Sequence, residues 1–163
     1  LRRQRQMCIR DRAITNLIAA GALPLEAAEK EQDNTSEGAI SRLRARAVVD
    51  KRWAWQKLVE DDLTNLEARY LMDGLTFTYD GLEGLTDEHF RAAPALWERL
   101  TNEMAQRTLE GMYPRWDVTA EAVDKANALL NGDAPSGLKR VIAEGQDRIA
   151  RAVRNREVDA AAN

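Results

Sequence analysis

The chain has 163 residues, of which 44% are hydrophobic and 31% charged, and its formal net charge is −3. This composition is typical of one soluble globular domain with a substantial core, and the scarcity of glycine and proline favours helix. No apolar run approaches the roughly 18 residues that a membrane-spanning helix needs. The single cysteine excludes an intramolecular disulfide and a multi-cysteine zinc site, and we expect a cytoplasmic protein.

Residues 1–12 differ from the rest of the chain. They contain five arginines, one aspartate and the only cysteine, Cys8. Residues 4–12, QRQMCIRDR, resemble translated sequencing-adapter read-through, so we exclude the segment from functional reasoning. The alternative is a basic arm that contacts nucleic acid or an anionic surface. Removing five positive charges and one negative charge changes the net charge from −3 to −7, and this acidity argues against a nucleic-acid partner.

Helices are predicted at short intervals in the first half of the chain, over Ala13–Ala20, Leu25–Gln32 and Gly38–Val48. Asn34, Asp50 and Thr64 are expected N-cap residues. For Asn34 and Thr64 an acidic residue three positions later completes a capping box. The stretch Leu75–Tyr79 alternates apolar and polar residues. Since five residues without a partner strand cannot form a sheet, we interpret it as an extended loop.

The second half is predicted to be helical as well. One helix begins at Thr86, and Pro94 is placed in the first turn of a longer helix, Ala95–Glu110. Thr119–Leu130 and a final helix from Leu138 follow, with a frayed tail at residues 159–163. The fold class is therefore all-α, with about eight or nine helices in a HEAT-like α-solenoid or in layers of antiparallel helix pairs.

The final predicted helix, residues 138–157, is amphipathic. Its apolar residues fall at helical spacing, and its other face carries opposite charges four residues apart. The expected ion pairs are Arg140 with Glu144, Glu144 with Arg148, and Asp147 with Arg151. Each contributes only about 0.2–0.5 kcal/mol, so we expect a helix with one face packed and the other face solvated or docked.

No catalytic or metal-binding set is predicted within the chain. A zinc peptidase centre needs two histidines one helical turn apart and a glutamate, whereas His89 is the only histidine. We interpret His89 as a surface or interhelical residue. Cys8 lies in the excluded segment and is not expected to act as a nucleophile. The acidic run 60–62 is interpreted as a solvated helix end, and the aromatic residues as core.

Several short motifs occur in an order that resembles one known family. Their members in the final helix are Arg140, Glu144-Gly145, Asp147 and Arg151-Ala152. Earlier ones are Asp33-Asn34-Thr35 with Gly38, Lys51 with Trp55, Phe90 through Trp97, and Glu110 through Pro114. Together they resemble the C-terminal helical domain of actinobacterial-type aminopeptidase N, a zinc metallopeptidase family. On this resemblance, residues 13–158 are that domain, and the structural motif residues are Asp33, Thr35, Lys51, Trp55, Trp97, Glu144 and Asp147.

The resemblance implies a C-terminal fragment of a zinc-dependent aminopeptidase, a hydrolase that removes N-terminal amino acids from peptides. Zinc belongs to the parent enzyme, and no cofactor is expected to bind this fragment. The implied partners are the upstream catalytic domain of the same chain and peptide substrates, with no nucleic acid and no membrane. We expect the fragment to cap the peptide chamber without being catalytic. The alternative is a stand-alone helical-repeat scaffold that binds a protein partner.

Three arginines are candidates for contact with a peptide carboxylate or with another domain: Arg140, Arg151 and Arg115. For Arg140 and Arg151 we favour structural salt bridges with Glu144 and Asp147. Truncation of Arg140 is therefore expected to lower stability more than peptide affinity.

Overall fold

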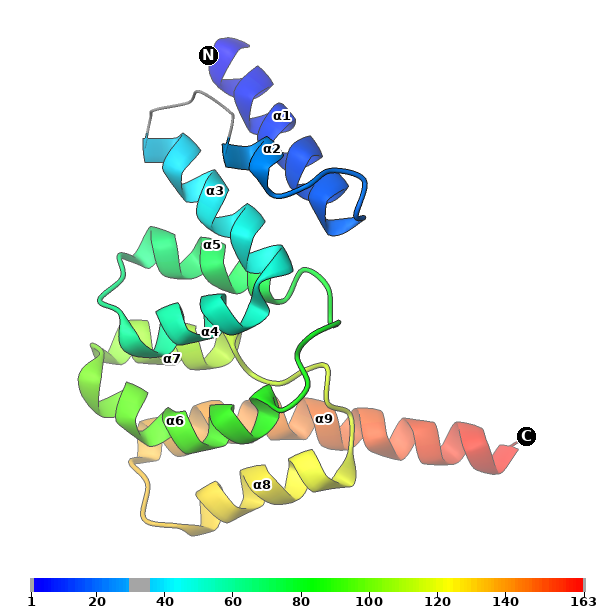
Figure 1. Cartoon of the computed structure of the whole chain (residues 1–163). Coiled ribbons are helices and arrows are strands. Elements are labelled where there is room, and N and C mark those ends of the chain that lie inside the picture. Colours follow the sequence, from blue (N-terminus) through cyan, green and yellow to red (C-terminus); the bar gives the residue numbers. More distant parts are fainter. Residues whose placement is uncertain (1, 30–35, 163) are drawn as a thin grey trace. The chain divides into compact units, whose positions relative to one another are not determined.

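The computed structural model describes residues 2–29 and 36–162, and within these ranges it forms nine helices and no strand (Figure 1). The predicted all-α class is thus confirmed. The helices are α1 (Arg2–Ala19), α2 (Glu26–Glu29), α3 (Ser36–Val49), α4 (Lys51–Glu60), α5 (Asn65–Leu75), α6 (Leu85–Arg99), α7 (Asn102–Gly111), α8 (Ala120–Asn131) and α9 (Ser136–Ala162). They divide into two compact units, Leu1–Gly81 and Leu82–Asn163.

The helix boundaries differ from the predicted ones at both ends of the chain. Helix α1 begins at Arg2 rather than at Ala13, so residues 2–12 are helical too. Helix α9 continues through residues 159–162, where a frayed tail was expected, and these residues are exposed. Asp33, Asn34 and Thr35 lie outside the described residues. The solenoid arrangement of the whole chain remains a prediction.

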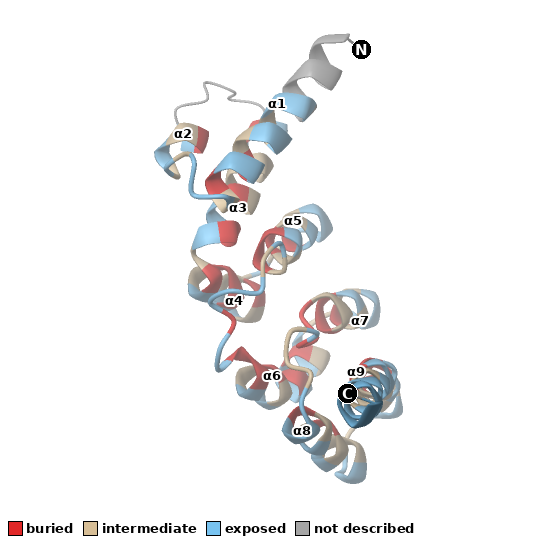
Figure 2. Cartoon of the chain, turned by 90° about the vertical axis from the view of Figure 1, so that its right-hand side faces the viewer, coloured by how far each residue is buried: buried red, intermediate tan, exposed pale blue. Residues whose placement is uncertain are grey.

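In the first unit, α3 packs against α1 on one side and α5 on the other, and α4 packs against α5. Figure 2 shows that the buried residues lie on the sides of these helices that face a neighbouring helix. The contact between α3 and α5 is close because α5 carries Gly74 there. A Cβ atom on Gly74 would lie 2.5 Å from the carbonyl oxygen of Arg44 and 2.7 Å from the Cβ of Ala47. Beside it, Nε of Arg44 lies 2.7 Å from Oδ2 of Asp73.

The first turn of α4 is joined to the last turn of α5 by a buried lysine. Asp50 caps α4 by accepting a hydrogen bond from the backbone N–H of Trp53 at 3.0 Å, as predicted. Lys51 is 6% exposed, and its Nζ donates to the carbonyl oxygens of Gly74 at 3.0 Å and Leu75 at 2.7 Å. Burial lowers the pKa of Lys51 to about 8, although Asp80 opposes this shift. Two carbonyl groups at the end of α5 thus gain a cationic donor, in addition to the backbone N–H of Phe77 that Gly74 already accepts.

Local signals also determine both ends of α5. The predicted capping box at Thr64 and Glu67 is present, with the two side chains each accepting from the other residue's backbone N–H. The helix ends at Leu75, and the following residues, through Gly84, form turns and a bend without a strand. The interpretation of this stretch as a loop is therefore confirmed, except that Leu75 belongs to the helix.

In the second unit, α9 packs against α8 and α7, and α6 contacts each of the other three helices. The predicted placement of Pro94 at the start of a helix is wrong, because Pro94 lies inside α6. Proline costs one backbone hydrogen bond there, yet Ala93 and Leu96 beside it are buried and hold α6 in place. The helix that was predicted to run through Glu110 is instead interrupted at Leu100, whose backbone is extended. Thr101 then caps α7, because its side chain accepts a hydrogen bond from the backbone N–H of Met104.

Helix α9 carries glycine at two points where an aromatic ring contacts it. A Cβ on Gly137 would lie 2.5 Å from the ring of Trp97, and a Cβ on Gly145 would lie 2.3 Å from the ring of Tyr113. Trp97 therefore anchors α6 against α9, and in the first unit Trp55 is buried with 3% exposure. The burial of Trp55 and the contact of Trp97 with α9 agree with the interpretation of these aromatic residues as core.

None of the helices within residues 2–29 and 36–162 is both long enough and apolar enough to cross a membrane.

The close contact at Gly74 predicts that Gly74→Ala destabilises the protein. The helix preference of alanine over glycine is worth at most about 1 kcal/mol. Forcing a methyl group against the α3 backbone costs about 1–3 kcal/mol. Thermal unfolding should therefore give a melting temperature several degrees below wild type. Gly132→Ala is the matched control, because its Cβ would meet carbonyl oxygens only at 3.5 Å. A melting temperature of Gly74→Ala that equals or exceeds that of Gly132→Ala contradicts the prediction.

Candidate functional site

His89 is the one histidine of the chain, and it lies inside the second unit. It is 1% exposed on α6. Its ring centroid lies 5.2 Å from that of Phe90 and 5.3 Å from that of Tyr113, in both cases in an edge-on arrangement. Burial lowers the pKa of His89 to about 3, so the imidazole is neutral at physiological pH. Of the two predicted environments, surface or interhelical, the structure selects the interhelical one.

The surroundings of His89 do not form a zinc site. Its neighbour Asp87 is engaged by a lysine of α8, since Oδ1 of Asp87 lies 2.5 Å from Nζ of Lys125. Across the described ranges, no group of three or more histidine, cysteine, aspartate or glutamate side chains comes together in a way that could hold a metal ion. The residues described here therefore do not fit the zinc that the family resemblance implies.

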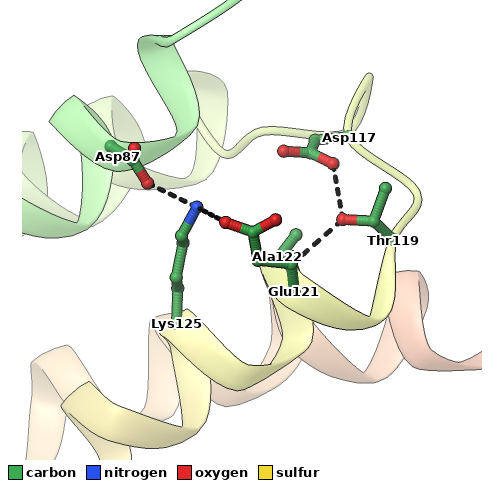
Figure 3. Close-up of polar contacts among 6 residues, drawn as sticks. All are labelled: Asp87, Asp117, Thr119, Glu121, Ala122 and Lys125. Carbon is green, nitrogen blue, oxygen red and sulfur yellow. Dashed lines mark hydrogen bonds and ion pairs between the residues drawn. The ribbon is translucent and has the colours of Figure 1, made fainter.

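The contact between Asp87 and Lys125 belongs to a polar cluster that joins α6 to α8 (Figure 3). Lys125 also contacts Glu121, one turn earlier on α8, at 2.7 Å. The hydrogen bonds to Asp87 and Glu121 raise the pKa of Lys125. Because Asp87 lies in the first turn of α6, its negative charge also interacts favourably with the positive end of the helix dipole.

The start of α8 lies in the same cluster. Thr119 caps the helix by accepting from the N–H of Ala122 at 3.1 Å, and its hydroxyl donates to Asp117 at 2.7 Å. The carboxylates of this region thus have identified structural partners, and the cluster fastens two helices together.

Two of the three predicted ion pairs of α9 are present. Nε of Arg140 lies 3.3 Å from Oε1 of Glu144, and Arg151 contacts Asp147. The predicted pair of Glu144 with Arg148 is wrong, because the structure has no such contact between these described residues. The side chains of Arg140 and Arg151 are 72% and 65% exposed. Their possible contact with a peptide carboxylate or another domain remains a prediction.

Arg115, the third candidate, lies in the turn that follows α7. Its Nη2 donates to the carbonyl oxygen of Glu110 at 3.2 Å, and the side chain is exposed. Arg115 therefore helps to satisfy the C-terminal carbonyl groups of α7. The acidic run at residues 60–62 likewise forms a helix end, where Asp61 is the C-cap of α4 and contacts Lys57.

A polar cleft of about 420 Å³ in the first unit was missed by the sequence reasoning. Residues of α1, α3 and α5 line it: Asp11, Arg12, Thr15, Ser41, Arg44, Arg69, Tyr70 and Asp73. Asp11 accepts a hydrogen bond from Ser41 at 3.0 Å, while Asp73 pairs with Arg44. No local signal predicts a cleft built from three helices. Because two of its lining residues belong to segment 1–12, we assign it no function.

Comparison with known proteins gives two matches. The family model of the ERAP1-like C-terminal domain matches residues 8–151. Aminopeptidase N of Streptomyces lividans is 33% identical over 144 residues, which cover 83% of this chain and 17% of that protein. The chain thus spans about 17% of the length of this relative. The family match includes Lys51, Trp55, Trp97, Glu144 and Asp147, and also residues 8–12 of the excluded segment.

Burial of His89 predicts that stability decreases as the pH falls. Its pKa is about 3 in the folded chain and about 6.5 in an unfolded one. Between these two pH values the unfolded state binds more protons at this residue than the folded state does. The stability that the neutral His89 gives to the folded chain is therefore complete above about pH 6.5 and is lost as the pH falls towards about 3. From about pH 8 to about pH 5 the free energy of unfolding should fall by about 2 kcal/mol more in wild type than in His89→Gln. Urea titrations of both proteins measure this difference; equal pH slopes contradict it.

The exposure of Arg140 predicts a small effect of its truncation. Because the pair with Glu144 is exposed, Arg140→Ala should lower the free energy of unfolding by about 0.2–0.5 kcal/mol. A double-mutant cycle with Glu144→Ala, measured by denaturant unfolding, isolates the pair. A coupling energy of zero between the two substitutions contradicts the assignment of Arg140 to a structural role.

Proposed function

Because this chain belongs to the ERAP1-like C-terminal domain family, we propose that it is the C-terminal part of a zinc-dependent aminopeptidase N that removes N-terminal amino acids from peptides. The observation that carries this proposal is the match to the aminopeptidase of Streptomyces lividans, of which the chain covers only 17%. The greater part of such an enzyme lies outside the matched region and is available to hold the catalytic machinery.

The chemistry of the chain supports a non-catalytic role for this part of the enzyme. A zinc-activated water requires a metal centre with open coordination, which peptidases of this class build from two histidines and a glutamate. Here the one histidine is neutral, buried and packed between aromatic rings. In our proposal, the upstream domain of the same cytoplasmic enzyme supplies zinc, its ligands and the general base.

We assign to this chain the role of a HEAT-like helical cap over the peptide chamber. Helix pairs that pack face to face form a stiff wall, and such a wall limits the length and folding of the peptides that enter. The exposed charged faces of α7 and α9 are compatible with a surface that borders solvent or a polar substrate. Peptide substrates are thus partners of the whole enzyme, and this domain restricts their access.

The reading frame upstream of codon 13 provides the first test. We expect it to encode His-Glu-x-x-His followed by a downstream glutamate. A start codon with a ribosome site near Ala13 would instead favour the alternative, a stand-alone helical scaffold that binds a protein partner.

Activity measurements on the complete parent protein provide the second test. The parent should hydrolyse an aminoacyl anilide, the isolated chain with added zinc should not, and a parent lacking residues 13–163 should lose its discrimination against long peptides. A parent in which the first histidine of the zinc motif is replaced by alanine is the control for upstream catalysis. Hydrolysis by the isolated chain above the buffer rate would refute the proposal.

A further inference from the structure

The connection between α8 and α9 begins at an asparagine that is followed directly by a glycine. Asn131 is the last residue of α8, and Gly132 is the C-cap of that helix. Both residues are exposed. The two helices pack against each other on either side of this short connection (Figure 1). The pair therefore lies at a helix end to which water has direct access.

The side chain of Asn131 can change its orientation. Within residues 2–29 and 36–162, no hydrogen bond holds its amide group. Asn127, one turn earlier on α8, differs because its side chain accepts a hydrogen bond from Gln146 of α9. The Cγ atom of Asn131 is thus able to turn towards the next nitrogen of the backbone, whereas the amide of Asn127 is fixed.

That next nitrogen belongs to Gly132 and is only weakly held. Its N–H donates to the carbonyl oxygen of Leu129 at 3.3 Å, which is longer than a typical backbone hydrogen bond. Since Gly132 has no side chain, its nitrogen is not shielded and its backbone can adopt conformations that are closed to other residues. The ends of helices fray at little cost in free energy, so this N–H is readily released.

We propose that Asn131 and Gly132 form a site of spontaneous deamidation whose product weakens the end of α8. The nitrogen of Gly132 loses its proton to solvent hydroxide and forms a bond to Cγ of Asn131. The bond between Cγ and the side-chain nitrogen breaks, and that nitrogen takes a proton from water and leaves as ammonia. Water then opens the resulting succinimide ring. Attack at Cγ gives aspartate, and attack at the main-chain carbonyl carbon gives isoaspartate.

Both products add a negative charge at the C-terminal end of α8. This end already carries the negative pole of the helix dipole, and Asp133 follows two positions later. Isoaspartate also inserts one more carbon atom into the backbone of the connection. The start of α9 cannot shift freely to absorb it, because Gly137 lies against the ring of Trp97. The modification therefore loosens α8 where it joins α9, independently of any catalytic function of a parent enzyme.

Peptide mapping of the folded chain tests the modification. The chain is incubated at mildly alkaline pH, its helices are followed by circular dichroism, and tryptic peptides are analysed by mass spectrometry. Cleavage after Lys125 and Lys139 gives one peptide that contains both Asn131 and Asn127. Asn131 should exchange its amide for a carboxyl group, while Asn127 is the internal control and should stay intact. An isoaspartate-specific methyltransferase should label the same peptide.

The rate of conversion tests the part played by the helix end. Because a frayed end opens at a free energy near zero, the rate at Asn131 in the folded chain should be within about threefold of the rate in urea. Gly132→Ala should slow the conversion at least about threefold, since alanine restricts the backbone. This variant keeps the fold, because the added Cβ meets carbonyl oxygens only at 3.5 Å. Equal conversion of Asn127, or a folded chain in which Asn131 stays intact, overturns the proposal.

Thermal unfolding measures the effect of the product on stability. Asn131→Asp adds the negative charge without the change in the backbone, and it should lower the melting temperature by about 1–4 °C. Asn102→Asp is the matched control, because Asn102 is an exposed residue at the first position of α7, where the helix dipole favours a negative charge. A melting temperature of Asn131→Asp that equals that of Asn102→Asp overturns the proposed weakening of α8.

Discussion

The packing of the Tyr113 ring on Gly145 is the contact on which the second unit depends. A Cβ on Gly145 would lie 2.3 Å from that ring, so only glycine allows α9 to approach the chain leaving α7 so closely. The same ring stands 5.3 Å from His89 and 5.9 Å from Phe90, which brings α6 into one aromatic cluster with the other two segments. Burial raises the pKa of Tyr113 and lowers that of His89, so both rings are neutral parts of the core. A comparable approach at Gly74 brings α5 against α3 in the first unit.

Charged side chains at helix ends add polar contacts between helices that already pack through apolar residues. Helix ends leave backbone groups without partners, and a buried end must find them elsewhere. Lys51 supplies a cation to the carbonyl end of α5, and Asp87 in the first turn of α6 binds Lys125 of α8. Removing such a partner leaves the opposite group unsatisfied, and for a buried group this costs more than the contact itself contributes. These polar contacts therefore specify which helices are neighbours.

The contacts of His89 and Asp87 limit the chemistry that the second unit can perform. A histidine used as a packing residue is not available to bind metal, and the carboxylate of Asp87, two residues before it, is engaged by Lys125. The chain belongs to the ERAP1-like C-terminal domain family and spans about 17% of the length of the aminopeptidase N that it matches.

Local sequence was sufficient for the all-α class and for the caps at Asp50 and Thr64, because a capping hydrogen bond spans only three residues. The ion pairs one turn apart at Arg140 and Arg151 are local in the same sense. Local reasoning failed at Pro94, where burial of neighbouring residues outweighs the preference of proline for a first turn. Only the tertiary structure shows that His89 is buried and that Lys51 binds the carbonyl end of α5. The same holds for the packing of the Tyr113 ring on Gly145 and for the polar cleft of the first unit. Each of these joins residues far apart in the chain, and helical periodicity shows which face of a helix is buried but not which partner covers it.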